Sequence, residues 1–416
     1  MKLKFSATTL LLLLSISVSA QSSKPLETLH VRGGLPNFYS KAINTKDSLT
    51  VVYFGGSITH APGYREYSTQ WLNQNICNGR IRSINAAIPG TGSDLGVFRL
   101  ADDVLMHKPD LVFVEFAVND RKTDSTTITN SMEGIVRQIK NQNINADICF
   151  VYTICDDSML EFELKNELPV SIKQMEKVAQ HYGIPTINYG VDVIRLLNAD
   201  KLIFRAKADS TYGDKIIFTI DGVHPTIDQG HKVYEKTFIE NFPKLNISKK
   251  RQPKGLPNAL SAGNYENVHI YSPKVANNHG FRSANYKRDA KSFMKTFPDM
   301  IYSVSPKDSI VFNFKGTKIG VYDIIGPFGT NIAVSVDGGD FKNFARFDEW
   351  CSYTRVGFAL FDDLEDKEHR VVIKIGDKVE NKLATLGRRK PNIEYFEDIE
   401  QDCLYIGKIL VVGQIK

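Results

Sequence analysis

Between Leu49 and Phe242, short apolar runs alternate with longer segments whose apolar residues recur every three or four positions. The runs are rich in β-branched and aromatic residues, which predicts strands, and the longer repeat predicts helices. Strands and helices that alternate in this way form a parallel sheet covered on both faces. The predicted strands are 49–54, 81–87, 111–116, 148–154 and 185–189, and the predicted helices are 65–74, 95–106, 128–139, 175–182 and 226–242. Residues 198–219 fit no clear element.

Beyond residue 264 the apolar residues alternate with polar ones, which is the pattern of a strand with one buried face. Residues 405–412 are expected to form the last strand. Short strands separated by turns such as Asp337-Gly338-Gly339 predict a β-sandwich. The alternating positions are Ile310, Phe312 and Phe314; Ile332, Val334 and Val336; and Val371, Ile373 and Ile375.

The chain of 416 residues is too long for one core, so we expect two domains. The basic run Lys249-Lys250-Arg251, with nearby prolines and small polar residues, predicts a linker or a wrapping segment. The expected order is an N-terminal segment at 21–48, an α/β domain at 49–243, a linker at 244–264 and a β-sandwich at 265–416.

Residues 1–20 have the pattern of a secretory signal peptide. Lys2 and Lys4 precede the apolar run Leu10–Val18, and small residues follow up to Ala20, after which we expect cleavage. The run is too short to span a bilayer, and the chain has no second run of spanning length. We therefore expect an exported protein, periplasmic or secreted, without a transmembrane segment.

Charge and cysteine content exclude several classes of function. The formal net charge of +5 at pH 7 is weak and gives no electrostatic reason to expect nucleic acid or an anionic membrane as partner. The five cysteines cannot all pair. Cys351 and Cys403 could form a disulfide, which the sequence alone does not establish. No cysteine and histidine spacing resembles a metal site, so we expect neither a metal ion nor another cofactor.

Four segments with chemically useful residues adjoin the elements of the predicted sheet. Ser57 follows the first strand after two glycines, Gly90 follows the second, Asn119 follows the third, and Asp221 and His224 precede the last helix. In a parallel sheet, such loops open on the same edge, where ligands bind. We therefore expect these five residues to meet there.

Their side chains suit acyl transfer. A serine hydroxyl needs a base to remove its proton, and a histidine that is oriented by a carboxylate provides one. Ser57 would be the nucleophile, His224 the base and Asp221 its partner. Backbone N–H groups of Ser57 and Gly90, with the Asn119 carboxamide, would form the oxyanion hole.

These segments resemble the four sequence blocks of the SGNH hydrolases, the GDSL esterase and lipase superfamily. The blocks are Gly55-Gly56-Ser57-Ile58-Thr59, Gly90, Val118-Asn119-Asp120 and Asp221-Gly222-Val223-His224, in the order of the superfamily. The resemblance implies a flavodoxin-like three-layer α/β/α fold and assigns the same catalytic roles to these residues. The first block departs from Gly-Asp-Ser-Leu, and Ala117 stands where many members have glycine.

Other residues offer competing interpretations. His60 is near Ser57 but has no carboxylate spaced to orient it, and His231 is expected to be a packed or solvated histidine. Asp120 could orient a base, although it is more suited to holding its loop through backbone N–H groups. The acidic pairs Asp102-Asp103, Asp156-Asp157 and Asp362-Asp363 fit solvated faces or turns rather than glycosidase carboxylates.

In the second half, Trp350 and Tyr353 are candidate substrate-binding residues. They lie with Phe347 close to Arg346 and Arg355, and aromatic faces beside polar groups suit sugar stacking. Such a cluster can equally be core or domain interface.

The expected activity is hydrolysis of O-acetyl esters on polysaccharides or oligosaccharides. An exported member with an appended β-sandwich resembles bacterial carbohydrate acetylesterases, which is an analogy at the level of the fold. Two alternatives remain open, namely a lipid or thioester hydrolase that uses the same triad and a non-catalytic glycan-binding protein. The sequence does not identify the polysaccharide, the acetylated position or the oligomeric state.

Overall fold

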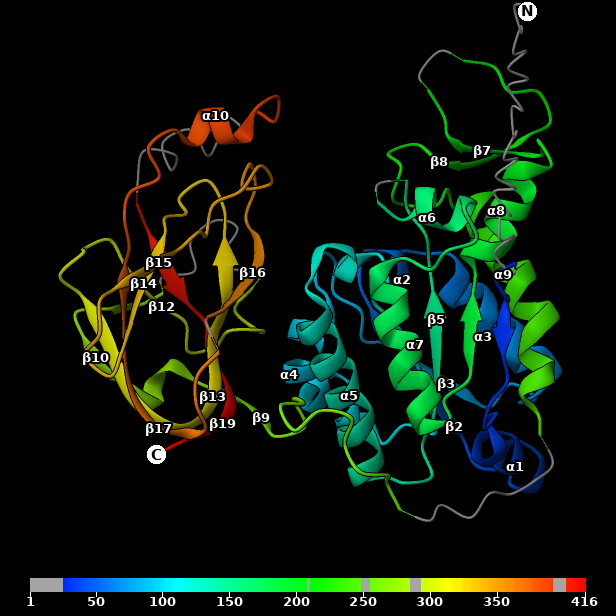
Figure 1. The fold of residues 1–416 in the computed structure, drawn as a ribbon, viewed down its shortest axis with the longest axis horizontal. Helices are drawn as coiled ribbons and strands as arrows, with labels where there is room; N and C mark the ends of the chain where they lie inside the picture. The colour runs from blue at the N-terminus through cyan, green and yellow to red at the C-terminus, as the bar shows by residue number, and fades with distance from the viewer. Residues whose placement is uncertain are drawn as a thin grey trace, which may run out of the picture.

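The computed structural model describes residues 25–156, 158–207, 210–247, 255–284, 293–361, 363–391 and 402–416. The predicted signal peptide lies outside these residues. The chain forms an α/β domain followed by an antiparallel β domain (Figure 1).

A six-stranded sheet forms the centre of the first domain, in the order β1-β6-β5-β4-β2-β3. The last five of these strands are parallel, and their order along the sheet is that of the flavodoxin-like fold. The strands are β1 (Leu29–His30), β2 (Leu49–Gly55), β3 (Ile81–Asn85), β4 (Leu111–Glu115), β5 (Asp147–Tyr152) and β6 (Thr186–Asn188). The predicted fold class is confirmed, and all five predicted strands are present.

One edge of the sheet carries a strand that was not predicted. β1 pairs with β6 in the antiparallel direction, with Leu29 opposite Ile187. Two residues are too few to produce a periodic pattern, so this strand could not be predicted from the sequence. The N-terminal segment thus adds a strand and the helix α1 (Pro36–Asn44) to the α/β domain.

Helices cover both faces of this sheet. α4, α5 and α7 pack side by side on one face, and α3 and α9 pack together on the other (Figure 1). Their buried stripes explain the helical spacing of the sequence, as in α5, where Ile128, Met132, Ile135 and Ile139 are buried. The helices are α2 (Ser57–His60), α3 (Tyr64–Asn75), α4 (Ser93–Asp103), α5 (Ser125–Gln142), α6 (Leu160–Leu164), α7 (Val170–Tyr182), α8 (Gly190–Asn198) and α9 (Gly230–Asn241), with 3₁₀ turns η1 (Leu105–His107), η2 (Asn119–Lys122) and η3 (Phe242–Leu245).

The segment without a predicted element contains a small sheet of its own. β7 (Leu202–Arg205) and β8 (Ile216–Thr219) pair in parallel, and β8 leads directly into the loop with Asp221 and His224.

The second domain contains two antiparallel sheets around one apolar core. The larger follows the order β15-β14-β17-β13-β19-β9, with β10 and β16 also paired to β13, and the smaller is β11-β12-β18. Apolar side chains of both sheets, among them Ile310, Ile373, Leu404 and Ile406, form the core. The elements are β9 (Val268–Tyr271), η4 (Pro273–Val275), β10 (Asn277–His279), β11 (Arg282–Ser283), β12 (Ile301–Ser303), β13 (Ser309–Ile325), β14 (Ile332–Val336), β15 (Lys342–Phe344), β16 (Arg355–Leu360), β17 (Lys367–Ile375), α10 (Lys382–Leu386), β18 (Leu404–Ile406) and β19 (Lys408–Ile415).

Two details of the second domain differ from the sequence interpretation. The single strand expected at 405–412 is two strands in different sheets, because the chain changes sheets at Gly407, where a Cβ would lie 2.4 Å from the Phe297 ring. Cys351 is a buried free thiol, so the disulfide with Cys403 that the sequence left open is not formed.

The two domains share apolar contacts. The core of the α/β domain continues into Tyr322, Ile324, Leu410 and Val412 on one face of the large β sheet. α4 lies against β9, so the β domain is packed onto the edge of the α/β domain that carries this helix.

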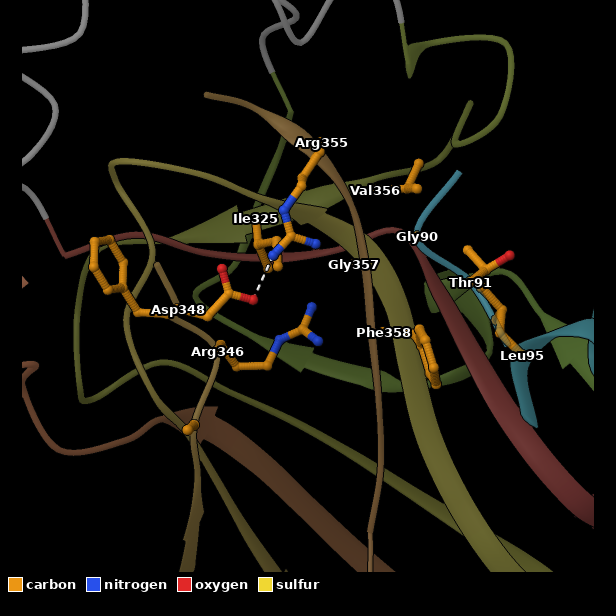
Figure 2. A pocket seen from close by; sticks show the side chains of 12 residues that line it. Gly90, Thr91, Leu95, Ile325, Arg346, Asp348, Arg355, Val356, Gly357 and Phe358 are labelled. Atoms are coloured by element: carbon orange, nitrogen blue, oxygen red, sulfur yellow. Dashed lines mark hydrogen bonds and ion pairs between the residues drawn. The ribbon is translucent and has the colours of Figure 1, made fainter. Parts of the chain in front are cut away.

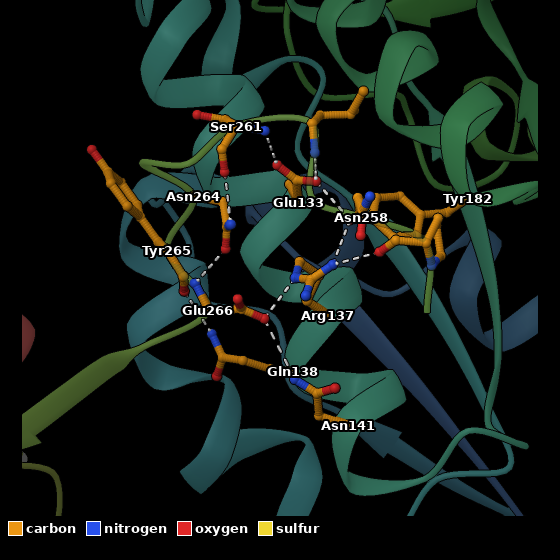
Figure 3. Close-up of polar contacts among 12 residues, drawn as sticks. Glu133, Arg137, Gln138, Asn141, Tyr182, Asn258, Ser261, Asn264, Tyr265 and Glu266 are labelled. Atoms are coloured by element: carbon orange, nitrogen blue, oxygen red, sulfur yellow. Dashed lines mark hydrogen bonds and ion pairs between the residues drawn. The ribbon is translucent and has the colours of Figure 1, made fainter. Parts of the chain in front are cut away.

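The segment between the domains runs along α5. The carboxylate of Glu133, a fully buried residue, accepts hydrogen bonds from the backbone N–H groups of Leu260 and Ser261 and from the hydroxyl of Tyr182 (Figure 3). Arg137 donates through Nε to Glu266, 2.6 Å away. These bonds hold residues 260–266 against the first domain.

Candidate active site

The turn after β2 presents Ser57 at the carboxyl edge of the sheet. Ser57 is the first residue of α2, and Gly56 precedes it in extended backbone. A Cβ at Gly56 would lie 2.0 Å from Oδ1 of Asn119, so the Asn119 carboxamide packs directly on the turn. A Cβ at Gly55 would lie 2.5 Å from the carbonyl oxygen of Glu115. Both glycines are therefore required by the close approach of the next strand and its loop.

The loop between β8 and α9 carries Asp221 and His224. Gly222, between them, has a φ of +89°, and a Cβ there would overlap the Asp156 carboxylate. The backbone N–H of Asp156 donates to the carbonyl of Gly222 at 2.8 Å. The loop is thus fixed to the segment that follows β5.

These two loops bring a hydroxyl, an imidazole and a carboxylate into one chain of hydrogen bonds. Oγ of Ser57 lies 2.8 Å from Nε2 of His224, and Nδ1 of His224 lies 2.6 Å from Oδ2 of Asp221. Ser57 is half-buried, whereas His224 and Asp221 are exposed at the surface. In this arrangement the ring can accept the proton of the hydroxyl while the carboxylate orients the ring.

The state of Asp221 determines which ring nitrogen of His224 carries the proton. Partial burial raises the pKa of Asp221, but hydrogen bonds from the His224 ring and from the N–H groups of His224 and Val223 outweigh it, and the net shift is downward. An ionised Asp221 accepts from Nδ1–H, which leaves Nε2 of His224 free to accept from the Ser57 hydroxyl.

Two further loops supply neutral donors on the same edge. Asn119 is the first residue of η2 and is half-buried against Gly56. Gly90 follows β3 with a φ of +74°, and its Cα faces open space. The structure thus places Gly90 and Asn119 in loops at the carboxyl ends of β3 and β4, the two strands that flank β2.

Asp120 supports these loops. Its carboxylate is fully buried and accepts from the backbone N–H of Ser93 at 2.9 Å, as predicted from the sequence. A Cβ at Gly92 would lie 2.2 Å from the same carboxylate oxygen. Asp120 therefore links the loop of Asn119 to the loop of Gly90.

The two other histidines near the site serve the structure. Nδ1 of His60 lies 3.0 Å from the carbonyl of Ala87. His231 is buried, and its Nδ1 accepts the backbone N–H of Tyr64 at 3.2 Å. A Cβ at Gly63 would lie 2.4 Å from the His231 ring, so the ring packs on the start of α3.

Burial of His231 should make the folded protein less stable in acid. Burial, with a smaller effect of His224, lowers the pKa of His231 to about 4, against about 6.5 in an unfolded chain. The folded protein therefore resists protonation, and stability that is complete above pH 6.5 is lost as the pH falls towards 4. The His231→Asn variant should avoid roughly 2–3 kcal/mol of this loss between pH 7 and 4.5, as measured by urea unfolding. An equal decline in this variant and in the exposed control His181→Asn would contradict the prediction.

A cavity of about 290 Å³ lies between Gly90 and the β domain. Gly90, Thr91 and Leu95 gather at one end, and Arg346, Asp348 and Arg355 gather at the other (Figure 2). Arg346 is buried and pairs with Asp323, and Arg355 pairs with Asp348. Burial raises the pKa of Asp323 to about 7, although Arg346 opposes the shift.

The candidate substrate-binding residues Trp350 and Tyr353 do not line this cavity. They are about half exposed, and the Arg389 guanidinium lies 3.2 Å from the centre of the Trp350 ring. Their neighbours Phe347 and Arg355 do line it. The substrate-binding role of Trp350 and Tyr353 stays a prediction.

Two buried charged residues near the site were missed. Arg99, on α4, donates to the carbonyl groups of Ala86 and Gly55 and so fixes the ends of β3 and β2. Glu115, the last residue of β4, contacts the serine turn. A glutamate that ends the apolar strand Leu111–Glu115 is a signal that could have identified the second of these residues.

In the part of the chain that the structure describes, no three His, Cys, Asp or Glu side chains are grouped as metal ligands would be. Within the same residues, no helix combines the length and the apolar character that crossing a bilayer requires.

The comparisons with known proteins assign the class. Residues 47–233 match the GDSL-like lipase/acylhydrolase family, and this domain belongs to that family. The protein is thus a carboxylic ester hydrolase, as predicted. Comparison with curated proteins found no match.

Similar solved structures extend over both domains. A two-domain esterase active on acetylated mannans, co-crystallised with mannopentaose, is 19% identical with a TM-score of 0.70, over 92% of this chain and 96% of that one. A second structure, described as a two-domain esterase active on acetylated mannans, is 18% identical with a TM-score of 0.69, over 92% of this chain and 97% of that one. An acetylxylan esterase mutant from Geobacillus stearothermophilus is 17% identical with a TM-score of 0.35, over 47% and 95%. At this identity, the first two establish a shared two-domain fold.

Proposed function

We propose that the protein is a serine esterase that removes O-acetyl groups from polysaccharides or oligosaccharides. The observation that carries the proposal is the Ser57–His224–Asp221 chain of hydrogen bonds, with separations of 2.8 and 2.6 Å, inside a GDSL-like domain.

In the proposed mechanism, Oγ of Ser57 attacks the ester carbonyl while Nε2 of His224 takes its proton. Asp221 stabilises the resulting imidazolium. The N–H groups of Ser57 and Gly90 and the carboxamide of Asn119 donate to the oxyanion. His224 then gives its proton to the departing sugar alcohol, and an acyl-enzyme remains on Ser57.

In the second half, water attacks the acyl-enzyme while His224 takes a proton from it. The tetrahedral intermediate collapses, Ser57 recovers its proton from His224, and acetic acid leaves and ionises to acetate in solution. Every proton that moves is carried by the histidine, so the chain needs no metal ion for this sequence of steps.

Two observations support a glycan as the alcohol part of the ester. The cavity that begins at Gly90 is bordered by Arg346, Asp348 and Arg355, and charged side chains that already have partners of opposite charge suit a neutral, hydroxyl-rich ligand. The mannan esterases with the same two-domain fold act on acetylated mannans, which makes a mannan a reasonable first substrate. Cleavage after Ala20 and export would bring the enzyme to such substrates.

A lipid or thioester hydrolase is the competing function. It would need an apolar channel for a long acyl chain, whereas the cavity beside Gly90 is lined by charged as well as apolar groups. This composition favours a small acyl group.

The test compares acyl lengths and polymers with the purified chain. We expect nitrophenyl acetate to be hydrolysed at least about tenfold faster than nitrophenyl octanoate, because a cavity that ends at charged groups excludes long apolar chains. Acetate should be released from acetylated mannan or another acetylated polysaccharide. Faster cleavage of the octanoate would favour the lipid hydrolase, and failure on every ester would favour a non-catalytic binding protein.

A further inference from the structure

We infer that Glu115 is a positioning residue of the esterase, which fixes the Ser57 turn relative to the segment that holds the His224 loop. The inference rests on the proposed role of Ser57 as nucleophile. Glu115 touches neither substrate nor reacting atoms, because its side chain is buried beneath the turn.

The location of Glu115 is unusual for a carboxylate. It ends β4, which is buried throughout, and it is 1% exposed. No cationic side chain among the described residues forms an ion pair with it. A buried carboxylate without a cation is costly unless several donors surround it. Burial accordingly raises the pKa of Glu115, although its hydrogen bonds oppose this shift.

The donors around Glu115 come from both sides of the nucleophile. Oε2 accepts from the Thr59 hydroxyl at 2.9 Å, and the N–H of Gly56 also donates to the carboxylate. Thr59 is held in turn by the Tyr64 hydroxyl at 2.6 Å. One side chain therefore binds the residue before Ser57 and the residue two positions after it.

The other oxygen of Glu115 reaches the next strand. Oε1 accepts from the hydroxyl of Thr153, just beyond β5, at 2.7 Å. Three residues further on, the N–H of Asp156 donates to the carbonyl of Gly222 in the loop of His224. The buried carboxylate thus connects the loop of the nucleophile to the loop of the base through one short segment.

This connection matters because the reaction needs a hydrogen bond between Ser57 and His224. The two residues are 167 positions apart in sequence, so only tertiary contacts set their separation. A small displacement of either loop lengthens this bond, and misplacement of about 1 Å lowers rates by up to roughly 10²-fold.

The experiment compares Glu115→Gln with Glu133→Gln. Glu133 is a matched control, since it is also fully buried and also accepts three hydrogen bonds, in its case from one hydroxyl and two backbone N–H groups, but it lies on α5 under the interdomain segment (Figure 3). We expect Glu115→Gln to lower kcat on nitrophenyl acetate by about tenfold or more with KM within twofold, and to slow labelling of Ser57 by a fluorophosphonate to the same extent. Glu133→Gln should change kcat and the labelling rate by less than twofold, even if it lowers the melting temperature as much as Glu115→Gln does.

A milder variant separates loss of positioning from loss of folding. Thr153→Val removes one donor but keeps the shape of the side chain, so it should lower kcat and the labelling rate in the same direction by a smaller factor. Equal effects of Glu115→Gln and Glu133→Gln, or wild-type kcat in both Glu115→Gln and Thr153→Val, would overturn the inference. Ser57→Ala separates the two questions, because full activity in that variant would instead overturn the proposed function.

Discussion

Replacing Ser57 by alanine should lower kcat on nitrophenyl acetate by about 10⁴-fold or more, because the attacking oxygen is lost while its base remains. The Ser57 hydroxyl donates the only proton that the proposed first step requires, and His224 lies 2.8 Å away to receive it. Rapid mixing should show a burst of nitrophenol in the wild type, since acyl-enzyme formation releases it first. The burst should be absent in the variant.

The control for this prediction is Ser125→Ala, which alters an exposed serine at the start of α5. It should retain wild-type kcat and burst amplitude. A burst that persists in Ser57→Ala would identify a different nucleophile and would also remove the basis for the inference about Glu115.

Replacing Asn119 by alanine should lower kcat by roughly 10²–10³-fold, about 3 kcal/mol in the barrier. The carboxamide is packed on Gly56 beside Ser57, and in the proposed mechanism it donates to the oxyanion that forms on the attacked carbonyl. KM should change little, because this bond strengthens only as negative charge develops in the transition state.

The aspartate variant sharpens the test. Asn119→Asp has nearly the same shape as wild type, but it replaces a donor with a negative charge, so it should lose at least as much kcat as the alanine variant. Wild-type turnover in Asn119→Ala would show that another donor serves the oxyanion.

The sequence predicted the elements of the α/β domain well because its strands are nearly all apolar. β2, β4 and β5 are buried along their whole length, and such runs are unmistakable. The edge strand β1 and the pair β7 and β8 were not predicted, because two to four residues are too few to show a period.

In the second domain, local pattern could not separate β18 from β19. Apolar residues continue on both sides of Gly407, where the chain changes sheets and where the Phe297 ring leaves no room for a Cβ. This contact is between residues far apart in sequence, which a period along one segment does not record.

At the site, the sequence identified residues whose chemistry is distinctive and missed those whose role is support. Ser57, Asn119 and His224 belong to recognisable blocks. Arg99 and Glu115 act through buried contacts with backbone and hydroxyl groups. Their partners lie in other strands and loops, so their role becomes visible only after the chain has folded.

The apolar contact between the two domains has a consequence for recognition. Because the core of the first domain extends to Ile324 and Leu410, the β domain is packed against the α/β domain through apolar side chains. The shape of the cavity beside Gly90 is then set by both domains, since residues of each line it. Under the proposed function, discrimination among acetylated chains would depend on which branches and neighbouring substituents fit this cavity. Replacing the β domain by an unrelated one would then change which chains are accepted.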